Sequence, residues 1–116
     1  MDTEELEQRL AELMSTLSEC EGLIVADKDG QVLVGQTLVE RDLDSIAKAA
    51  ASLINNSANL GGAVDKGTMK NAVFEYGGGF AILVNSDDKI FIALLGVDGR
   101  SSSTLLKRRL NSIANS

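Results

Sequence analysis

The chain has 116 residues, a 44% share of hydrophobic residues and a formal net charge of −6, which together are typical of one acidic globular domain over residues 1–116. It has no His and a single Cys, Cys20, so it lacks the usual general base, the commonest metal ligand and any partner for an intramolecular disulfide. The acidic balance argues against nucleic acids and acidic membranes as partners, and no apolar run reaches the roughly 18 residues of a membrane helix.

The first predicted element is an amphipathic helix over Thr3–Leu17. Its leucines recur at intervals of four and three residues, which places them on one narrow face among largely charged positions. Thr3 is the predicted N-cap, and the early glutamates suit the positive end of the helix dipole. Because this acidic start lacks the positive region of a signal peptide, we expect a soluble, cytoplasmic protein.

Two strands joined by a tight turn are predicted next. Glu21–Lys28 is short and rich in β-branched residues, and Gln31–Val34 returns as the second strand. Asp29-Gly30 between them is a strong hairpin signal, because glycine adopts the positive φ that a tight turn requires. Gly35 is expected to mark a bulge or the end of the second strand.

A long helix over Asp42–Leu60 is the element around which the other elements are expected to be organised. Asp42 is the predicted cap, and Gly61-Gly62 is expected to end the helix because glycine permits a left-handed closing conformation. The apolar arc of this helix is about twice as wide as the roughly 100° that a helix needs to cover a sheet. We therefore expect contacts with two partners; the alternative is a central helix buried within one domain.

The apolar arc of the long helix has two shoulders that differ in side-chain size. Large side chains form the first, which is expected to pack on the sheet of the same chain: Ile46, Leu53 and Leu60. Small side chains form the second, which would let another helix approach closely: Ala47, Ala51 and Ala58.

Three further strands are predicted after the long helix. They span Thr68–Tyr76, Phe80–Val84 and Ile90–Leu95. The last two are continuously apolar, as is the first strand of the hairpin, and such strands are typically covered on both faces of a sheet. We therefore place these three in the middle of a sheet, with Thr68–Tyr76 and the second hairpin strand at its edges.

A final helix is predicted over Ser102–Ala114, after a polar loop. The order α-β-β-α-β-β-β-α indicates an α+β fold with a five-stranded antiparallel sheet and helices on both faces. The first helix is strongly acidic, whereas the last carries Lys107, Arg108 and Arg109 and no acid. Arg109 falls inside the apolar arc, and two interpretations remain open: its stem covers the edge of the core with its head in water, or it pairs with a glutamate of the first helix.

No stretch carries a full catalytic, phosphate-binding or metal-binding motif. Gly96–Ser101 lacks the spacing and the lysine of a P-loop, and Gly77–Gly79 opens a strand rather than a helix. Asp27 and Asp29 begin like a calcium loop, but the pattern fails at the later positions that need Gly and Glu. The hydroxyls of Ser101–Thr104 have no candidate base and are expected to cap the last helix. We expect no cofactor, no metal and no enzymatic activity.

Over Leu6–Ile113 the chain resembles the Roadblock/LC7 family, the domain of dynein light chains, Ragulator roadblock subunits and MglB-like proteins. The resemblance rests on Gly22–Gly30 (GLIVADKDG), the long helix that begins near Asp42, the glycine turn before Phe80–Val84 (FAILV), the strand Ile90–Leu95 (IFIALL) and the final helix. It implies a homodimer or heterodimer in which the third strands pair edge to edge and the second helices pack side by side across a two-fold axis.

Carried over to this chain, the resemblance implies a homodimer through helix 42–60 and strand 68–76, in a profilin-like fold. The residues implied at the interface are Ala47, Ala50, Ala51, Ile54, Ala58, Met69, Asn71 and Val73. The implied function is that of a non-enzymatic regulator or scaffold which binds a Ras-like small GTPase. The alternative is a small-molecule sensor or a signalling-interaction module with a similar fold. No short motif marks GTPase-contacting residues, so none is assigned.

Overall fold

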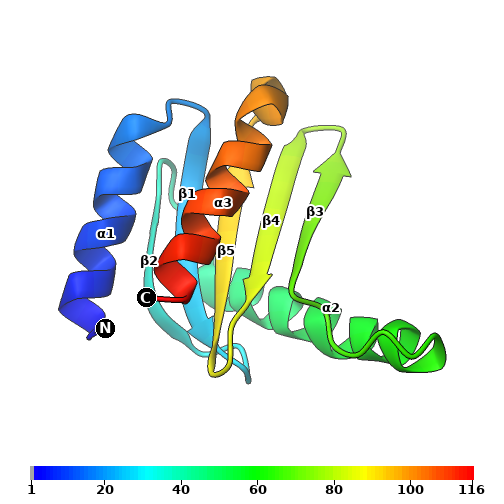
Figure 1. Ribbon diagram of the computed structural model, residues 1–116. Helices are drawn as coiled ribbons and strands as arrows, with labels where there is room; N and C mark the ends of the chain where they lie inside the picture. The colour runs from blue at the N-terminus through cyan, green and yellow to red at the C-terminus, as the bar shows by residue number, and fades with distance from the viewer. Residues whose placement is uncertain (1) are drawn as a thin grey trace.

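The computed structural model describes residues 2–116 and shows the elements in the expected order (Figure 1). The α-helices in this part of the chain are α1 (Thr3–Thr16), α2 (Leu43–Ala63) and α3 (Ser103–Ala114). A 3-10 helix, η1 (Val97–Ser102), replaces the loop expected before α3. The strands are β1 (Cys20–Asp27), β2 (Val32–Thr37), β3 (Asn71–Tyr76), β4 (Gly79–Asn85) and β5 (Lys89–Leu95).

The strands form one antiparallel sheet in the order β2-β1-β5-β4-β3. The continuously apolar strands β1, β5 and β4 lie in the middle, and the more polar β2 and β3 lie at the edges. This placement follows from burial, since a strand covered on both faces needs apolar side chains on both. The predicted α+β class, strand number and edge strands are confirmed.

The sheet is covered by helices on both faces (Figure 1). On one face α1 and α3 bury their leucines, including Leu6, Leu10 and Leu106. These leucines pack against apolar side chains of β1, β2, β4 and β5. On the other face α2 packs through Ala50, Ala51 and Ile54 against a second cluster of isoleucines and leucines. The sheet therefore separates two cores, and the surfaces beyond α2 and beyond α3 lie on opposite sides of the molecule.

The β1–β2 hairpin turns at Asp29-Gly30 as predicted. Gly30 has a φ of 86°, and the side chain of Asp27 accepts hydrogen bonds from the backbone N–H groups of Asp29 and Gln31, each at 2.9 Å. The irregularity in the ladder lies between Val25 and Ala26. Gly35 instead sits inside β2, so the prediction of a bulge or strand end at that glycine is wrong.

The caps of the helices differ in part from the prediction. Asp2, rather than Thr3, caps α1 by accepting a hydrogen bond from the Glu5 N–H at 2.8 Å. Asp42 caps α2 as predicted, and hydrogen bonds from the hydroxyl and the backbone N–H of Ser45 hold the pKa of its carboxyl below the usual value. No serine side chain caps α3, because η1 leads into that helix without an extended N-cap residue.

The end of α2 lies beyond the predicted stop at Gly61-Gly62. Both glycines are helical, and the chain reverses only at Asp65, which has a φ of 58°. A Cβ placed on Gly61 would lie 1.8 Å from the carbonyl oxygen of Gly67, so the returning loop packs directly on the helix backbone. The Lys66 N–H also donates to the Gly61 carbonyl at 2.7 Å. We call this contact between Gly61 and residues 66–67 the clasp. After this loop, β3 begins at Asn71 rather than at Thr68.

Replacing Gly61 with Ala is expected to lower the free energy of unfolding by at least about 2 kcal/mol, because a methyl group cannot occupy the position of a backbone carbonyl. Gly62→Ala is the matched control: nothing lies within 4 Å of a Cβ at that helical position. The control is expected to raise the stability by about 0.5 kcal/mol through the helix propensity of alanine. Urea unfolding of the two variants tests the prediction, which fails if they change stability in the same direction.

Candidate functional site

The first half of α2 is a buried helix whose small side chains face the sheet of the same chain. Ala47 is 0% exposed, and Ala50, Ala51 and Ile54 are also buried. The prediction that the alanine shoulder faces a second chain is therefore wrong for Ala47 and Ala51, and the structure does not expose Ala50 or Ile54 to a second chain either. Ala58, two turns further on, is exposed.

The hairpin of β1 and β2 explains why small residues face inward. A Cβ at Gly30 would lie 2.9 Å from the Lys48 Cα and 3.2 Å from the Ala47 carbonyl oxygen. The backbone of α2 therefore lies directly against the backbone of the turn, and a larger side chain than alanine would push the two apart. The close approach that the small side chains of α2 allow was predicted between two chains. It occurs instead between α2 and the β1–β2 turn of the same chain.

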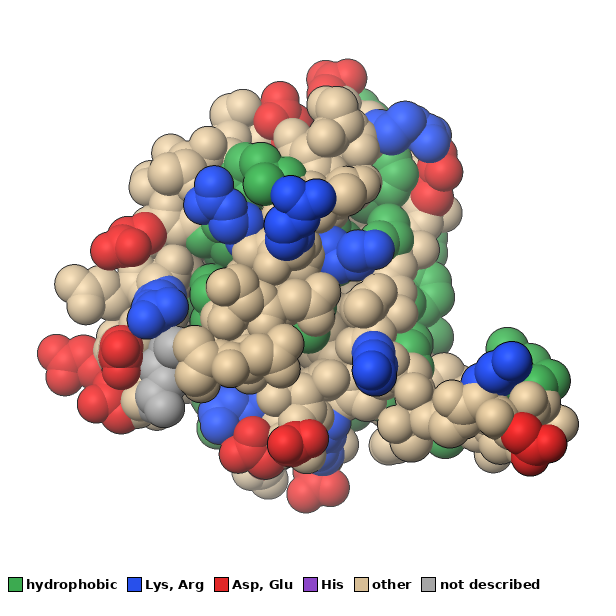
Figure 2. All heavy atoms as spheres, viewed as in Figure 1, with side chains coloured by type: hydrophobic (Ala, Val, Ile, Leu, Met, Phe, Trp, Pro, Cys, Tyr) green, Lys and Arg blue, Asp and Glu red, His purple; other side chains and the backbone are tan. Residues whose placement is uncertain are grey.

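The second half of α2 extends past the edge of the sheet. Figure 1 shows this half passing beyond β3, and Figure 2 shows its end standing clear of the body of the molecule. Leu53, Leu60 and Val64 are 41%, 70% and 50% exposed, respectively. At 100° per residue these three side chains share one side of the helix with Ile46, which is half-buried against the second core cluster. We call Leu53, Leu60 and Val64 the exposed stripe of α2; the prediction that Leu53 and Leu60 pack on the sheet is wrong.

Strand β3 presents a free edge beside this overhang. It pairs with β4 and is the last strand of the sheet, so its outer backbone groups have no neighbouring strand within residues 2–116. Val73 is 44% exposed, and Asn71 is exposed on the same face, the one that carries α1 and α3. Met69 lies before the strand and packs, half-buried, on the α2 cluster.

The predicted interface residues therefore fall into two groups. Four are buried in the core of the same chain: Ala47, Ala50, Ala51 and Ile54. Four lie at or near the free surface formed by the overhang and the edge of the sheet: Ala58, Met69, Asn71 and Val73. Leu53, Leu60 and Val64 were not predicted to be surface residues. Their spacing in the sequence places them on one side of the helix, but nothing in the sequence shows where the sheet beneath the helix ends.

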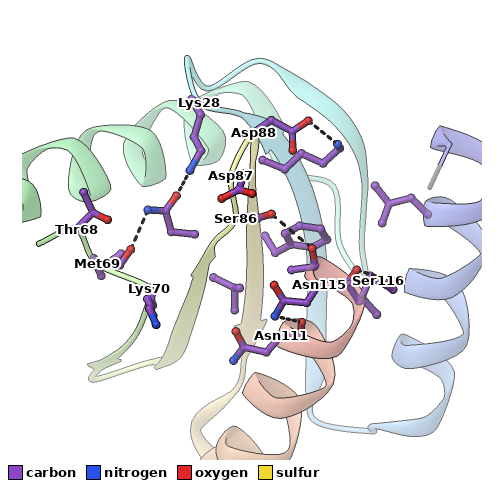
Figure 3. A pocket seen from close by; sticks show the side chains of 17 residues that line it. Lys28, Thr68, Met69, Lys70, Ser86, Asp87, Asp88, Asn111, Asn115 and Ser116 are labelled. Carbon is purple, nitrogen blue, oxygen red and sulfur yellow. Dashed lines mark hydrogen bonds and ion pairs between the residues drawn. The ribbon is translucent and has the colours of Figure 1, made fainter.

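A second feature is an open cleft of about 800 Å³ between the C-terminal end of α3, the β4–β5 turn and the segment before β3 (Figure 3). Its lining is mainly polar, and the side chains that provide charge or hydrogen bonds include Lys28, Lys70, Asn85, Asp87, Asp88 and Asn111. Such a lining differs from the enclosed, mostly apolar walls of typical small-molecule pockets.

The polar groups of the cleft are largely engaged with one another. The Lys28 ammonium donates to the Asn85 amide oxygen, and the Asn85 amide nitrogen donates to the Met69 carbonyl at 2.8 Å. Asp88 pairs with Lys89 at 3.1 Å. Partial burial lowers the pKa of Lys28, against the opposing effect of Asp87 and Asp88. These bonds tie three segments together, so the cleft gives little support to a sensor function.

The described residues contain no cluster of three or more His, Cys, Asp or Glu side chains that could hold a metal ion. Cys20 is buried, and burial raises the pKa of its thiol, which disfavours the reactive thiolate. Within residues 2–116 no helix is long and apolar enough to cross a membrane. The surface formed by the exposed stripe of α2 and the edge of β3 is therefore the main candidate site.

Comparisons with known proteins agree with this architecture. The chain matches the model of the Roadblock/LC7 domain over residues 6–96. Its structure is similar to that of Myxococcus xanthus MglB, with a TM-score of 0.85, 14% identity, and coverage of 98% of this chain and 85% of MglB. For a Roadblock/LC7 domain from Streptomyces avermitilis the TM-score is 0.82, with 15% identity and coverage of 94% and 91%.

A third similar structure is that of the gliding protein MglB from Thermus thermophilus, with a TM-score of 0.71 at 15% identity and coverage of 95% and 91%. At such identities the structures show a shared fold alone. Comparison with curated protein sequences gave no significant match.

Proposed function

The chain belongs to the Roadblock/LC7 domain family, and from this premise we propose that it is a dimeric, non-enzymatic regulator or scaffold of a Ras-like small GTPase. The observation that supports the dimer is that an uncovered apolar stripe on α2 lies beside the free edge of β3. Within residues 2–116, nothing covers the exposed stripe of α2, and β3 has no neighbouring strand on its outer side. A second copy of the chain would supply both.

In the proposed dimer the two β3 strands pair edge to edge and continue the sheet. The two overhanging helices then meet across the two-fold axis, with the stripe of each covered by the other chain. Ala58 would allow the helices to approach, while Met69, Asn71 and Val73 would flank the strand pair. Ala47, Ala50, Ala51 and Ile54 would support the seam from within each chain.

The magnitude of the burial is compatible with a stable dimer. Leu53, Leu60 and Val64 are 41%, 70% and 50% exposed. Covering these exposed fractions on both chains would contribute on the order of 5–10 kcal/mol, given about 1.5–3 kcal/mol for a fully exposed aliphatic side chain. The cost of association is roughly 4–15 kcal/mol. The burial is therefore of the same size as this cost, and edge-to-edge strand pairing would add backbone hydrogen bonds to it.

The GTPase role rests on family membership, since the resemblance implies binding and regulation of Ras-like GTPases. The alternative, a small-molecule sensor, is weakened by the polar, internally bonded lining of the cleft.

The dimer is expected to bind a Ras-like GTPase encoded close to its own gene. Calorimetry would compare that GTPase loaded with GDP and with a non-hydrolysable GTP analogue, and the expected result is at least tenfold tighter binding of one nucleotide state. Release of inorganic phosphate, followed with and without the chain, shows whether hydrolysis is stimulated. If an intact dimer binds neither nucleotide state, the GTPase role is wrong even though the dimer stands.

A further inference from the structure

The outward surface of α3 concentrates positive charge on a chain whose net charge is −6. Arg108 and Arg109 are exposed, Lys107 is half-buried, and α3 contains no acidic residue. Leu105 is 38% exposed and lies between the two arginines on the helical wheel. Figure 2 shows basic side chains gathered over α3 on the face turned toward the viewer. We call Leu105, Lys107, Arg108 and Arg109 the basic surface.

Among residues 2–116, no acidic side chain forms an ion pair with this surface. The ion pairs within residues 2–116 are Glu5–Arg9, Asp88–Lys89 and Glu75–Arg100, and none involves α3. The acidic helix α1 packs over β1 and β2, whereas α3 packs over β4 and β5. The interpretation of Arg109 as a partner of a glutamate on α1 is therefore wrong; its head is exposed.

We propose that the basic surface docks an acidic, amphipathic segment of a partner protein, with glutamates or aspartates against the arginines and one apolar side chain against Leu105. Charge complementarity points to the acidic character of the partner. An exposed leucine between two arginines points to a peptide, because an apolar anchor flanked by charged groups is the usual anatomy of a small protein interface.

Nucleic acid and membrane fit this surface less well. A single-stranded nucleic acid needs exposed aromatic rings for stacking, but Phe80 and Phe91 are buried, and Tyr76 and Phe74 lie on the opposite face of the sheet. An anionic lipid surface needs a broader cluster of about 4–8 lysine and arginine residues. The remaining surface of this acidic chain would repel either polyanion.

The basic surface and the proposed dimer seam do not overlap. The two surfaces belong to different elements: the basic surface lies on α3, which packs over β4 and β5, whereas the seam consists of the exposed stripe of α2 and the edge strand β3. Docking at α3 therefore does not depend on the dimer or on the GTPase, and a failure of either proposal leaves the other testable.

The test is fluorescence anisotropy on the full chain at low ionic strength. The probe is a labelled 16-residue peptide of Glu with Leu at every fourth position, and the comparison probes are the same peptide with Lys for Glu and a 16-nucleotide oligouridine. We expect the acidic peptide alone to bind, with affinity that falls at least tenfold when salt rises to about 0.3 M. Tighter binding of oligouridine than of the acidic peptide would overturn the proposal.

The location of the site is tested with a pair of variants of equal charge. Arg108→Glu/Arg109→Glu is expected to weaken binding of the acidic peptide at least tenfold. Lys48→Glu/Lys66→Glu makes the same change in net charge at exposed positions on α2 and the loop that follows it, and is expected to weaken binding less than twofold. Equal weakening by both pairs would mean a diffuse charge effect and would overturn docking at α3.

Discussion

The Leu60→Glu variant is expected to be a folded monomer. Leu60 is the most exposed member of the stripe, at 70%, so the single chain loses little by the change. In the proposed dimer, however, the substitution places two carboxylates in an apolar seam, one from each chain, where they are desolvated and repel each other. The dimer dissociation constant is expected to rise at least 100-fold, which corresponds to about 2.7 kcal/mol.

Light scattering coupled to size exclusion at tens of micromolar measures this effect, and circular dichroism checks the fold. Asn59→Glu is the matched control, because it adds the same charge at the neighbouring residue on the polar arc of α2. The control is expected to remain a dimer. A Leu60→Glu protein that still elutes as a dimer would show that the exposed stripe of α2 is not the seam.

Ala51→Arg is expected to damage the fold of the single chain. Ala51 is 5% exposed and packs in the core cluster beneath α2, so an arginine there leaves either a buried unpaired charge or a displaced helix. We expect a loss of about 3–5 kcal/mol in the free energy of unfolding. For a domain with about 5–15 kcal/mol of stability, such a loss is a large fraction of the total.

Urea unfolding with circular dichroism detection measures the loss. Asn55→Arg is the matched control, because Asn55 lies one turn further along α2 but is exposed. The control is expected to leave the unfolding free energy of the monomer within about 0.5 kcal/mol. Similar stabilities for the two variants would contradict the burial of the first half of α2 against its own sheet.

The sheet was predictable from sequence because burial leaves a direct pattern in strands. Continuous apolar runs marked β1, β4 and β5 as central, and the polar residues of β3 marked it as an edge. The hairpin at Asp29-Gly30 was predictable because the turn needs a positive φ. These features depend on local chemistry alone.

The orientation of α2 was not predictable on the same basis. A helical wheel separates large from small side chains, but it does not show which group faces the sheet. That choice is made by the hairpin turn at Gly30, which lies against the helix backbone and leaves room only for alanines. The length of α2 was missed for a similar reason, since Gly61 and Gly62 remain helical and the returning loop packs on Gly61 through the carbonyl of Gly67.

The clasp between Gly61 and residues 66–67 would lower the entropy cost of association at the overhanging half of α2 in the proposed dimer. A helix end that extends beyond its sheet would ordinarily fray, and freezing it on association would cost backbone entropy. The Lys66–Gly61 hydrogen bond and the close backbone packing hold this end in its helical form beforehand. Preorganisation of this kind preserves affinity by removing an ordering cost. Gly61, which was predicted to end the helix, is thus the residue at which the end of α2 is held in its helical form.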